Sequence, residues 1–229
     1  MNYTAVKTKI QAMSAKLLTF HDYEELCRGA AVGVAVASLE DDFERISSYI
    51  YAKPVRNFIK TMAGNLTTNH WSYILWGKLP TLDKPNRNAL RRVLGTEIDL
   101  RNILWLYRLK QFHNTQGNAS LGSLIPASHR LARETLTALV NCKDAGTLTQ
   151  ALTKTSYRRI FTTPEDFRLG EQALSRAVRA QFRKESLTAG AVCICRYLYE
   201  KHLEVRNLHT IAQGLKFGFS PEEIFGRLC

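Results

Sequence analysis

The sequence predicts an all-α protein. Its 229 residues include only 6 Pro and 13 Gly, whereas β-sandwiches and barrels need many turn residues. Residues that cap helices precede several runs in which apolar side chains recur at helical spacing. A six-residue segment also recurs 105 positions further along the chain. With 45% apolar residues, the chain can bury a substantial core. The recurring segment indicates that this core is built from repeated helical units.

Three helix starts can be placed from residues whose side-chain oxygens accept free amides of a first turn. Thr19–Asp22 opens one short helix. Thr163–Asp166 starts another, which we expect to run to about Lys184. Ser220–Glu223 is a capping box with proline at the first helical position, and it opens a final short helix.

Two longer helices are expected between these starts, over Asn86–Phe112 and Thr188–Lys216. Each ends near a glycine or asparagine that can adopt the left-handed conformation. The stretch His113–Ser123 is polar and contains glycine, which is typical of a connection. We therefore predict an N-terminal helical repeat over residues 1–115 and a C-terminal helical repeat over residues 116–229.

The recurring segment lies in these two helices. Ile98–Ile103 matches Leu203–Leu208, and all six positions are identical or conservative. An internal duplication is the simplest explanation. The polar residues of the match are Asp99, Arg101 and Asn102 in the first copy and Glu204, Arg206 and Asn207 in the second.

Asparagine in the middle of a helix, twice in the same register, indicates a specific polar contact, because its amide competes for backbone hydrogen bonds. Two interpretations stay open for these six residues. They satisfy a neighbouring segment within their own repeat, as buried polar groups usually do, or they contact a partner inserted between the repeats.

The formal charge of +12 predicts an anionic partner. The segment Lys154–Lys184 holds eight Lys or Arg and three Asp or Glu, and Arg176, Arg179 and Arg183 follow one helical stripe. This stripe is either an ordinary solvated face or a contact with anionic lipid or acidic loops of a partner. The charge also leaves open a basic helical module that binds nucleic acid.

Aromatic side chains are grouped in two of the expected helices, and they are Trp71, Tyr73, Trp76, Trp105 and Tyr107. They could stack on bases of single-stranded nucleic acid. Their helical spacing among aliphatic residues favours core packing instead.

The sequence contains no pattern that indicates catalysis, and we predict no catalytic residue, cofactor, metal or small-molecule substrate. Five cysteines without repeated spacing favour reduced thiols. His202 and His209 lie two turns apart, but no third ligand follows at the next helical positions.

The N-terminal segment MNYTAVKTKIQAM is typical of an amphipathic helix, because it lacks the apolar centre of a signal peptide. The longest apolar stretch, over residues 189–194, is far shorter than the ~20 residues of a membrane span. We therefore expect a cytoplasmic protein that can lie beside a membrane without crossing it.

Three segments resemble one known family. EVRNLHTIAQGLKFGFSPEEIFGRL is similar to the C-terminus of the C-type subunit, named d in eukaryotes, of rotary vacuolar/archaeal-type ATPases. GTEIDLRNILWLYRLKQF resembles the equivalent helix of an earlier repeat, and KLLTFHDYEELCRGA resembles the N-terminal segment. Members usually carry three repeats and this chain has room for about two. The Lys-Glu-x-Glu pattern of the family is here Lys201-His202-Leu203-Glu204.

The resemblance implies an α-helical funnel or partial funnel without chemistry of its own. Such a protein sits on the membrane proteolipid ring, receives the tip of the central shaft and transmits torque during ion transport. The partners implied are the shaft proteins and the ring, at the inner face of the membrane.

Overall fold

The computed structural model describes residues 4–29, 39–68, 70–113, 121–161, 163–185 and 190–229. Within these ranges the chain forms helices and no strand, which confirms the all-α prediction. The helices are α1 (Thr4–Ser14), α2 (Phe20–Cys27), α3 (Leu39–Ser47), α4 (Lys53–Ala63), α5 (Trp71–Trp76), α6 (Lys84–Arg108), α8 (Arg133–Val140), α9 (Ala145–Leu152), α10 (Pro164–Arg168), α11 (Gly170–Glu185), α12 (Gly190–Lys216) and α13 (Pro221–Phe225). A 3₁₀ turn lies at Leu79–Thr81, and a π-helical turn at Leu109–His113 continues α6.

The predicted helix starts are confirmed. Thr19, Thr163 and Ser220 each accept the backbone N–H three residues later, and the side chain at that later position bonds back to the cap residue. Asp144 forms a further capping box at the start of α9. These contacts are local, so the sequence alone specifies them.

The prediction of one continuous helix from Thr163 to about Lys184 is wrong. α10 ends at Arg168, Leu169 leaves the helical conformation, and α11 begins at Gly170. Gly170 lies against α6 so closely that a Cβ there would be 2.3 Å from Leu104 Cδ2. A poor helix former at a close helix crossing explains the break.

The two long helices form as predicted, with small shifts at their ends. α6 begins at Lys84 rather than Asn86, with Pro85 in its first turn, and α12 is described from Gly190. Gly218, which follows α12, has φ of +71°, the left-handed conformation expected at that end. The predicted start at Thr188 and most of the polar connection, residues 114–120, lie outside the described residues.

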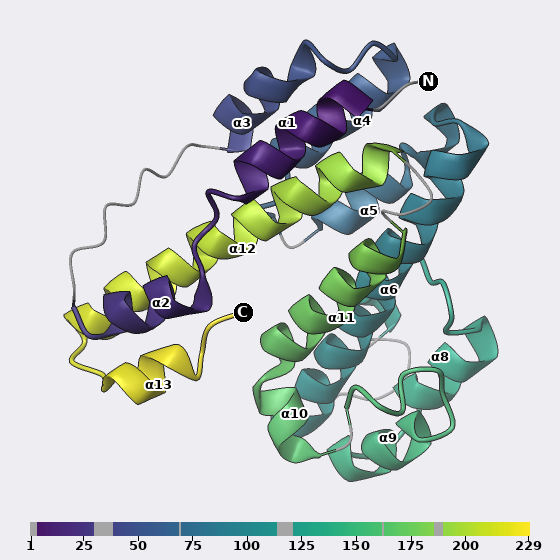
Figure 1. Cartoon of the computed structure of the whole chain (residues 1–229). Helices are drawn as coiled ribbons and strands as arrows, with labels where there is room; N and C mark the ends of the chain where they lie inside the picture. Colours follow the sequence, from purple (N-terminus) through teal and green to yellow (C-terminus); the bar gives the residue numbers. More distant parts are fainter. Residues whose placement is uncertain (1–3, 30–38, 69, 114–120, 162, 186–189) are drawn as a thin grey trace.

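α11 lies along α6 and also packs against α12, and α1 lies beside α12 (Figure 1). α2 and α13 gather at the C-terminal end of α12, whereas α8, α9 and α10 lie together at the lower right, beside α6 and α11 (Figure 1). The main core takes side chains from both predicted repeats, from Val6 to Leu203. The boundary predicted between residues 115 and 116 falls among residues that the structure does not describe, and it stays a prediction.

A smaller core lies where α2, α12 and α13 meet, around Cys27, Ile211 and Ile224. Gly214 permits this contact, since a Cβ there would be 2.5 Å from Ile224 Cγ1. The amphipathic N-terminal helix is confirmed as α1, which buries Val6, Ile10 and Met13. None of the described helices combines the length and apolarity that crossing a membrane requires.

Core packing was expected for five aromatic residues, and the structure supports this only in part. Trp71 is buried, but Tyr73 and Trp105 are 40% and 44% exposed. Tyr107 stacks on Phe167 of α10 with ring centroids 3.8 Å apart. Helical spacing therefore did not reveal which aromatic residues face outward.

Candidate functional site: a polar cavity between the long helices

Asn102 of α6 and Asn207 of α12 make the same contact. Asn102 Oδ1 accepts the Ile125 N–H at 2.9 Å and its Nδ2 donates to the Ile125 carbonyl at 3.1 Å. Asn207 Oδ1 accepts the Cys229 N–H at 2.8 Å and its Nδ2 donates to the Cys229 carbonyl at 3.1 Å. Each side-chain amide thus binds the backbone of a later segment to its long helix. The bonded residue lies 23 positions after Asn102 and 22 positions after Asn207.

The acids of the matching segments also hold backbone. Asp99 is fully buried and accepts the N–H groups of His129, Arg130 and Leu131 at 2.9, 2.6 and 3.2 Å. It accepts the Tyr157 hydroxyl at 2.7 Å as well. Burial, together with the Asp99 carboxylate, raises the pKa of Tyr157, so that hydroxyl remains a donor.

Glu204 has a similar task at the corresponding place in α12. It accepts the Leu18 N–H at 2.7 Å and forms an ion pair with Lys201. Four of the six residues, two acids and two asparagines, therefore satisfy segments of the chain itself. The contacts of Asp99, Asn102 and Glu204 cross the predicted boundary between residues 115 and 116, so they are not confined to one predicted repeat. Contact of these residues with a partner stays a prediction.

Unlike the acids and asparagines, the two arginines of the match, Arg101 and Arg206, line a cavity. This cavity of about 370 Å³ lies between α6, α11, α12 and the segment before α5. Arg101 donates to Glu97 Oε1 at 2.6 Å. Arg206 lies 3.7 Å from Glu171 of α11, and Arg108 lies 3.6 Å from the same carboxylate. The tertiary structure thus brings the repeated arginines to one shared space.

Glu97 and His202 occupy equivalent positions, 105 residues apart and each four residues before its arginine. Glu97 is fully buried, and burial raises its pKa while Arg101 opposes that shift. His202 replaces this acid in α12, so Arg206 lacks the carboxylate that Arg101 has and turns to Glu171 instead.

His202 is uncharged at neutral pH. Burial, together with the nearby positive charges of Arg206 and Arg101, lowers its pKa to about 4. Around the cavity, Arg101, Arg108 and Arg206 face two carboxylates, Glu97 and Glu171. One positive charge is therefore in excess beside a neutral histidine.

The cavity adjoins a second one of about 390 Å³, which shares Arg101 and Glu171 as lining residues. Trp105 lines this second cavity with 44% of its surface exposed, and Arg108 lies beside it. An exposed tryptophan next to arginines is a combination enriched where proteins bind one another. We refer to the two adjoining cavities as the inter-helix groove.

A family model described as the ATP synthase (C/AC39) subunit matches residues 74–227, more than half of the chain. The chain belongs to this C/AC39 family. The match includes α6, α11 and α12, and so the three helices that surround the inter-helix groove. Membership confirms the resemblance to the C-type subunit of V/A-type ATPases, although the N-terminal segment KLLTFHDYEELCRGA lies outside the matched residues. No curated protein sequence gives a significant match to the chain.

Members of the C/AC39 family are non-catalytic stalk subunits of the ATPase. In this member, no group of three or more His, Cys, Asp or Glu is placed to hold a metal ion within the described ranges. His202 is buried, while His209 is exposed and bonds to Gln213 at 2.8 Å.

The basic stripe predicted on α11 is divided in the structure. Arg176 and Arg183 are exposed. Arg179 points to α12, where its Nε lies 2.8 Å from Glu200 Oε2. Contact of this stripe with an anionic surface remains a prediction, and Arg179 is engaged within the fold.

Sequence reasoning missed Glu97 and Glu171 as members of the site. Glu97 could have been found, because it lies four residues before Arg101 on the same helix, the spacing of a helical ion pair. Glu171 could not, since only the packing of α11 against α6 and α12 places it between the arginines.

The neutral state of His202 predicts a pH-dependent stability. His202 takes up a proton near pH 6.5 in the unfolded chain but only near pH 4 in the folded chain. The stability that the neutral His202 contributes is therefore fully present above pH 6.5 and is lost as the pH falls from 6.5 to 4. From pH 7 to pH 5 we expect a contribution of about 2 kcal/mol to this loss. Urea unfolding at both pH values, for wild type and His202→Gln, measures it. An equal loss in both proteins would contradict the prediction.

Proposed function

We propose that this C/AC39 protein is a non-catalytic rotor adaptor, which couples the central shaft of a V/A-type ATPase to the membrane proteolipid ring during ion transport. The observation that carries the proposal is the inter-helix groove. The three helices that surround it lie within the family match, and the arginines at equivalent places in α6 and α12 share it.

The groove has the properties of a protein-binding site rather than those of a reaction centre. Its excess positive charge favours an acidic side chain or a chain terminus of the shaft. Trp105, at the second cavity, offers apolar area to a helix. A helical shaft tip can therefore contact the groove with both kinds of group, while another face rests on the ring at the cytoplasmic side.

The proposal includes a duplication in which α6 and α12 descend from one copied helix. The matching pairs of hydrogen bonds that Asn102 and Asn207 make to the backbone, which we call the asparagine clamps, support this duplication. Two unrelated helices have no reason to bind a segment 22 or 23 residues later through the same two bonds. An arrangement of these repeats as a partial funnel is part of the same proposal. Neither the fold nor the family match supports the nucleic-acid alternative.

Binding to the isolated shaft proteins tests the function. Arg206→Glu reverses a charge that is partly exposed in the groove, and we expect about tenfold weaker binding in a pull-down or by calorimetry, because an acidic group of the shaft would then be repelled. Arg196→Glu is the matched control, since Arg196 is on the same helix but outside the groove, and it should change affinity by less than about twofold. Equal effects of the two variants, or no binding of the wild-type protein, would refute the proposal.

A further inference from the structure

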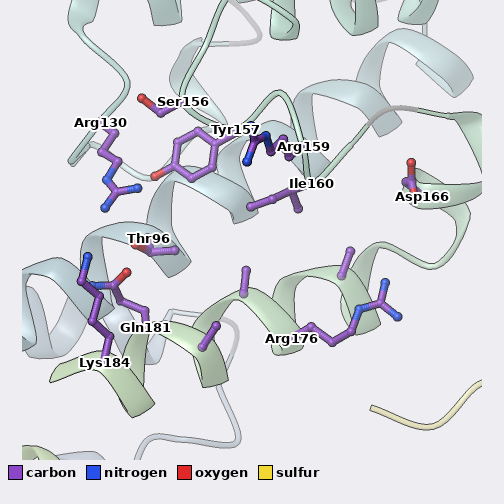
Figure 2. Close-up of a pocket in the computed structure, with 13 residues that line it drawn as sticks. Thr96, Arg130, Ser156, Tyr157, Arg159, Ile160, Asp166, Arg176, Gln181 and Lys184 are labelled. Atoms are coloured by element: carbon purple, nitrogen blue, oxygen red, sulfur yellow. The ribbon is translucent and has the colours of Figure 1, made fainter. Parts of the chain in front are cut away.

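A separate cavity of about 530 Å³ lies on another side of α11, beneath the segment that follows α9. Its cationic lining residues are Arg130, Arg159, Arg176 and Lys184 (Figure 2). They come from the segment before α8, the segment after α9 and the outer face of α11. We call this cavity the basic pocket. Only the tertiary structure brings these four charges together.

The charges of the basic pocket are not neutralised by the fold. None of the four cations forms an ion pair with a carboxylate of the described ranges, whereas nearby Arg168 and Arg179 pair with Glu165 and Glu200. A cleft lined by one sign of charge concentrates the field and attracts counter-ions of the opposite sign.

The one carboxylate that lines the pocket has another task. Asp166 accepts the Thr163 N–H at 2.8 Å and the Thr163 hydroxyl at 3.0 Å, in the capping box that starts α10. In Figure 2 it lies near Arg176, at the opposite end from Arg130 and Lys184. The end of the pocket formed by Arg130 and Lys184 is therefore cationic, and within the described ranges no carboxylate forms an ion pair with these two residues.

The arrangement of the donors indicates which anion fits. Arg130 and Lys184 approach one end from opposite walls, and Arg159 and Arg176 lie further along (Figure 2). Guanidinium groups bind phosphate through two parallel N–H donors, and the Ser156 hydroxyl adds another donor. Charges distributed along the pocket match several anionic groups better than one.

We propose that the basic pocket binds a ligand carrying two or more phosphate groups, either as a soluble polyphosphate compound or as the phosphorylated headgroup of a lipid. The two sources share the recognition chemistry and differ in whether a membrane must be present. The inference does not depend on the rotor-adaptor function, because it concerns the free protein and a different face of α11.

Calorimetric titration of the full chain with tripolyphosphate tests the proposal, with inorganic phosphate as the single-phosphate comparison. We expect tripolyphosphate to bind at least about tenfold more tightly than phosphate, and the affinity to fall as salt rises. In the double variant Arg130→Gln with Arg176→Gln, the affinity should fall about tenfold or more.

The matched control is the double variant Arg56→Gln with Lys60→Gln, which removes two exposed charges of α4. It should keep the affinity for tripolyphosphate within about twofold of wild type. Circular dichroism checks that both variants fold. Equal losses in the two double variants, or equal affinities for phosphate and tripolyphosphate, would overturn the proposal.

Vesicles of phosphatidylcholine with and without phosphatidylinositol 4,5-bisphosphate, whose headgroup carries several phosphate groups, distinguish the two sources. Recruitment to phosphatidylinositol 4,5-bisphosphate that tripolyphosphate competes away, and that the Arg130→Gln with Arg176→Gln variant loses, supports a lipid headgroup. Tripolyphosphate binding without vesicle recruitment supports a soluble ligand. Absence of binding in both assays at low salt would refute the proposal.

Discussion

Replacement of Asp99 by alanine is expected to lower the free energy of unfolding by about 4 kcal/mol, the largest effect that we predict. The carboxylate receives three backbone N–H groups and the Tyr157 hydroxyl. Alanine would leave these donors without an acceptor in a site where Asp99 itself is fully buried. Urea unfolding at neutral pH, followed by circular dichroism, measures the loss.

Two further variants keep this prediction testable even if Asp99→Ala does not fold. Asp99→Asn retains one oxygen acceptor but loses the charge, so we expect about half the loss. Asp144→Ala removes an exposed helix cap of the same residue type, and it should cost about a quarter as much as Asp99→Ala. If Asp99→Ala were no more damaging than Asp144→Ala, the assigned role of Asp99 would be wrong.

Asn102→Ala is expected to cost about 3 kcal/mol, the second largest effect. The variant leaves the Ile125 N–H without an acceptor at a residue that is 7% exposed. It also removes one of two bonds to the Ile125 carbonyl, which still accepts the Ala127 N–H at 2.8 Å. Asn207→Ala removes the same pair of bonds at a partly buried place, so a smaller loss of about 1–2 kcal/mol is expected. Urea unfolding gives both values.

Hydrogen exchange locates the two effects. The Ile125 amide should lose protection in Asn102→Ala, and the Cys229 amide should lose it in Asn207→Ala, since each amide donates to the replaced side chain. Asn57→Ala is the control, because Asn57 is exposed on α4, and its stability should stay within about 0.5 kcal/mol of wild type. Unchanged exchange at Ile125 and Cys229 would contradict the clamp assignment.

The sequence by itself determined the helical class, three capped helix starts and the presence of the two long helices. The capping boxes at Thr19, Thr163 and Ser220 are contacts between residues three apart, so neighbouring side chains fully specify them. The long helices α6 and α12 follow from apolar periodicity, which is also local information. The match between Asp99-x-Arg-Asn and Glu204-x-Arg-Asn also marked positions whose side chains make specific polar contacts in the structure.

Only the tertiary structure decided what these positions do. The asparagines find their partners 22 and 23 residues away, whereas Arg101 and Arg206 meet at one cavity because α11 packs against both long helices. The uncharged state of His202 likewise comes from its burial beside two arginines. Sequence spacing reveals which residues share a face of one helix. Burial, charge and hydrogen-bond partners depend on segments that approach from elsewhere in the chain, and so they appear only once the chain is folded.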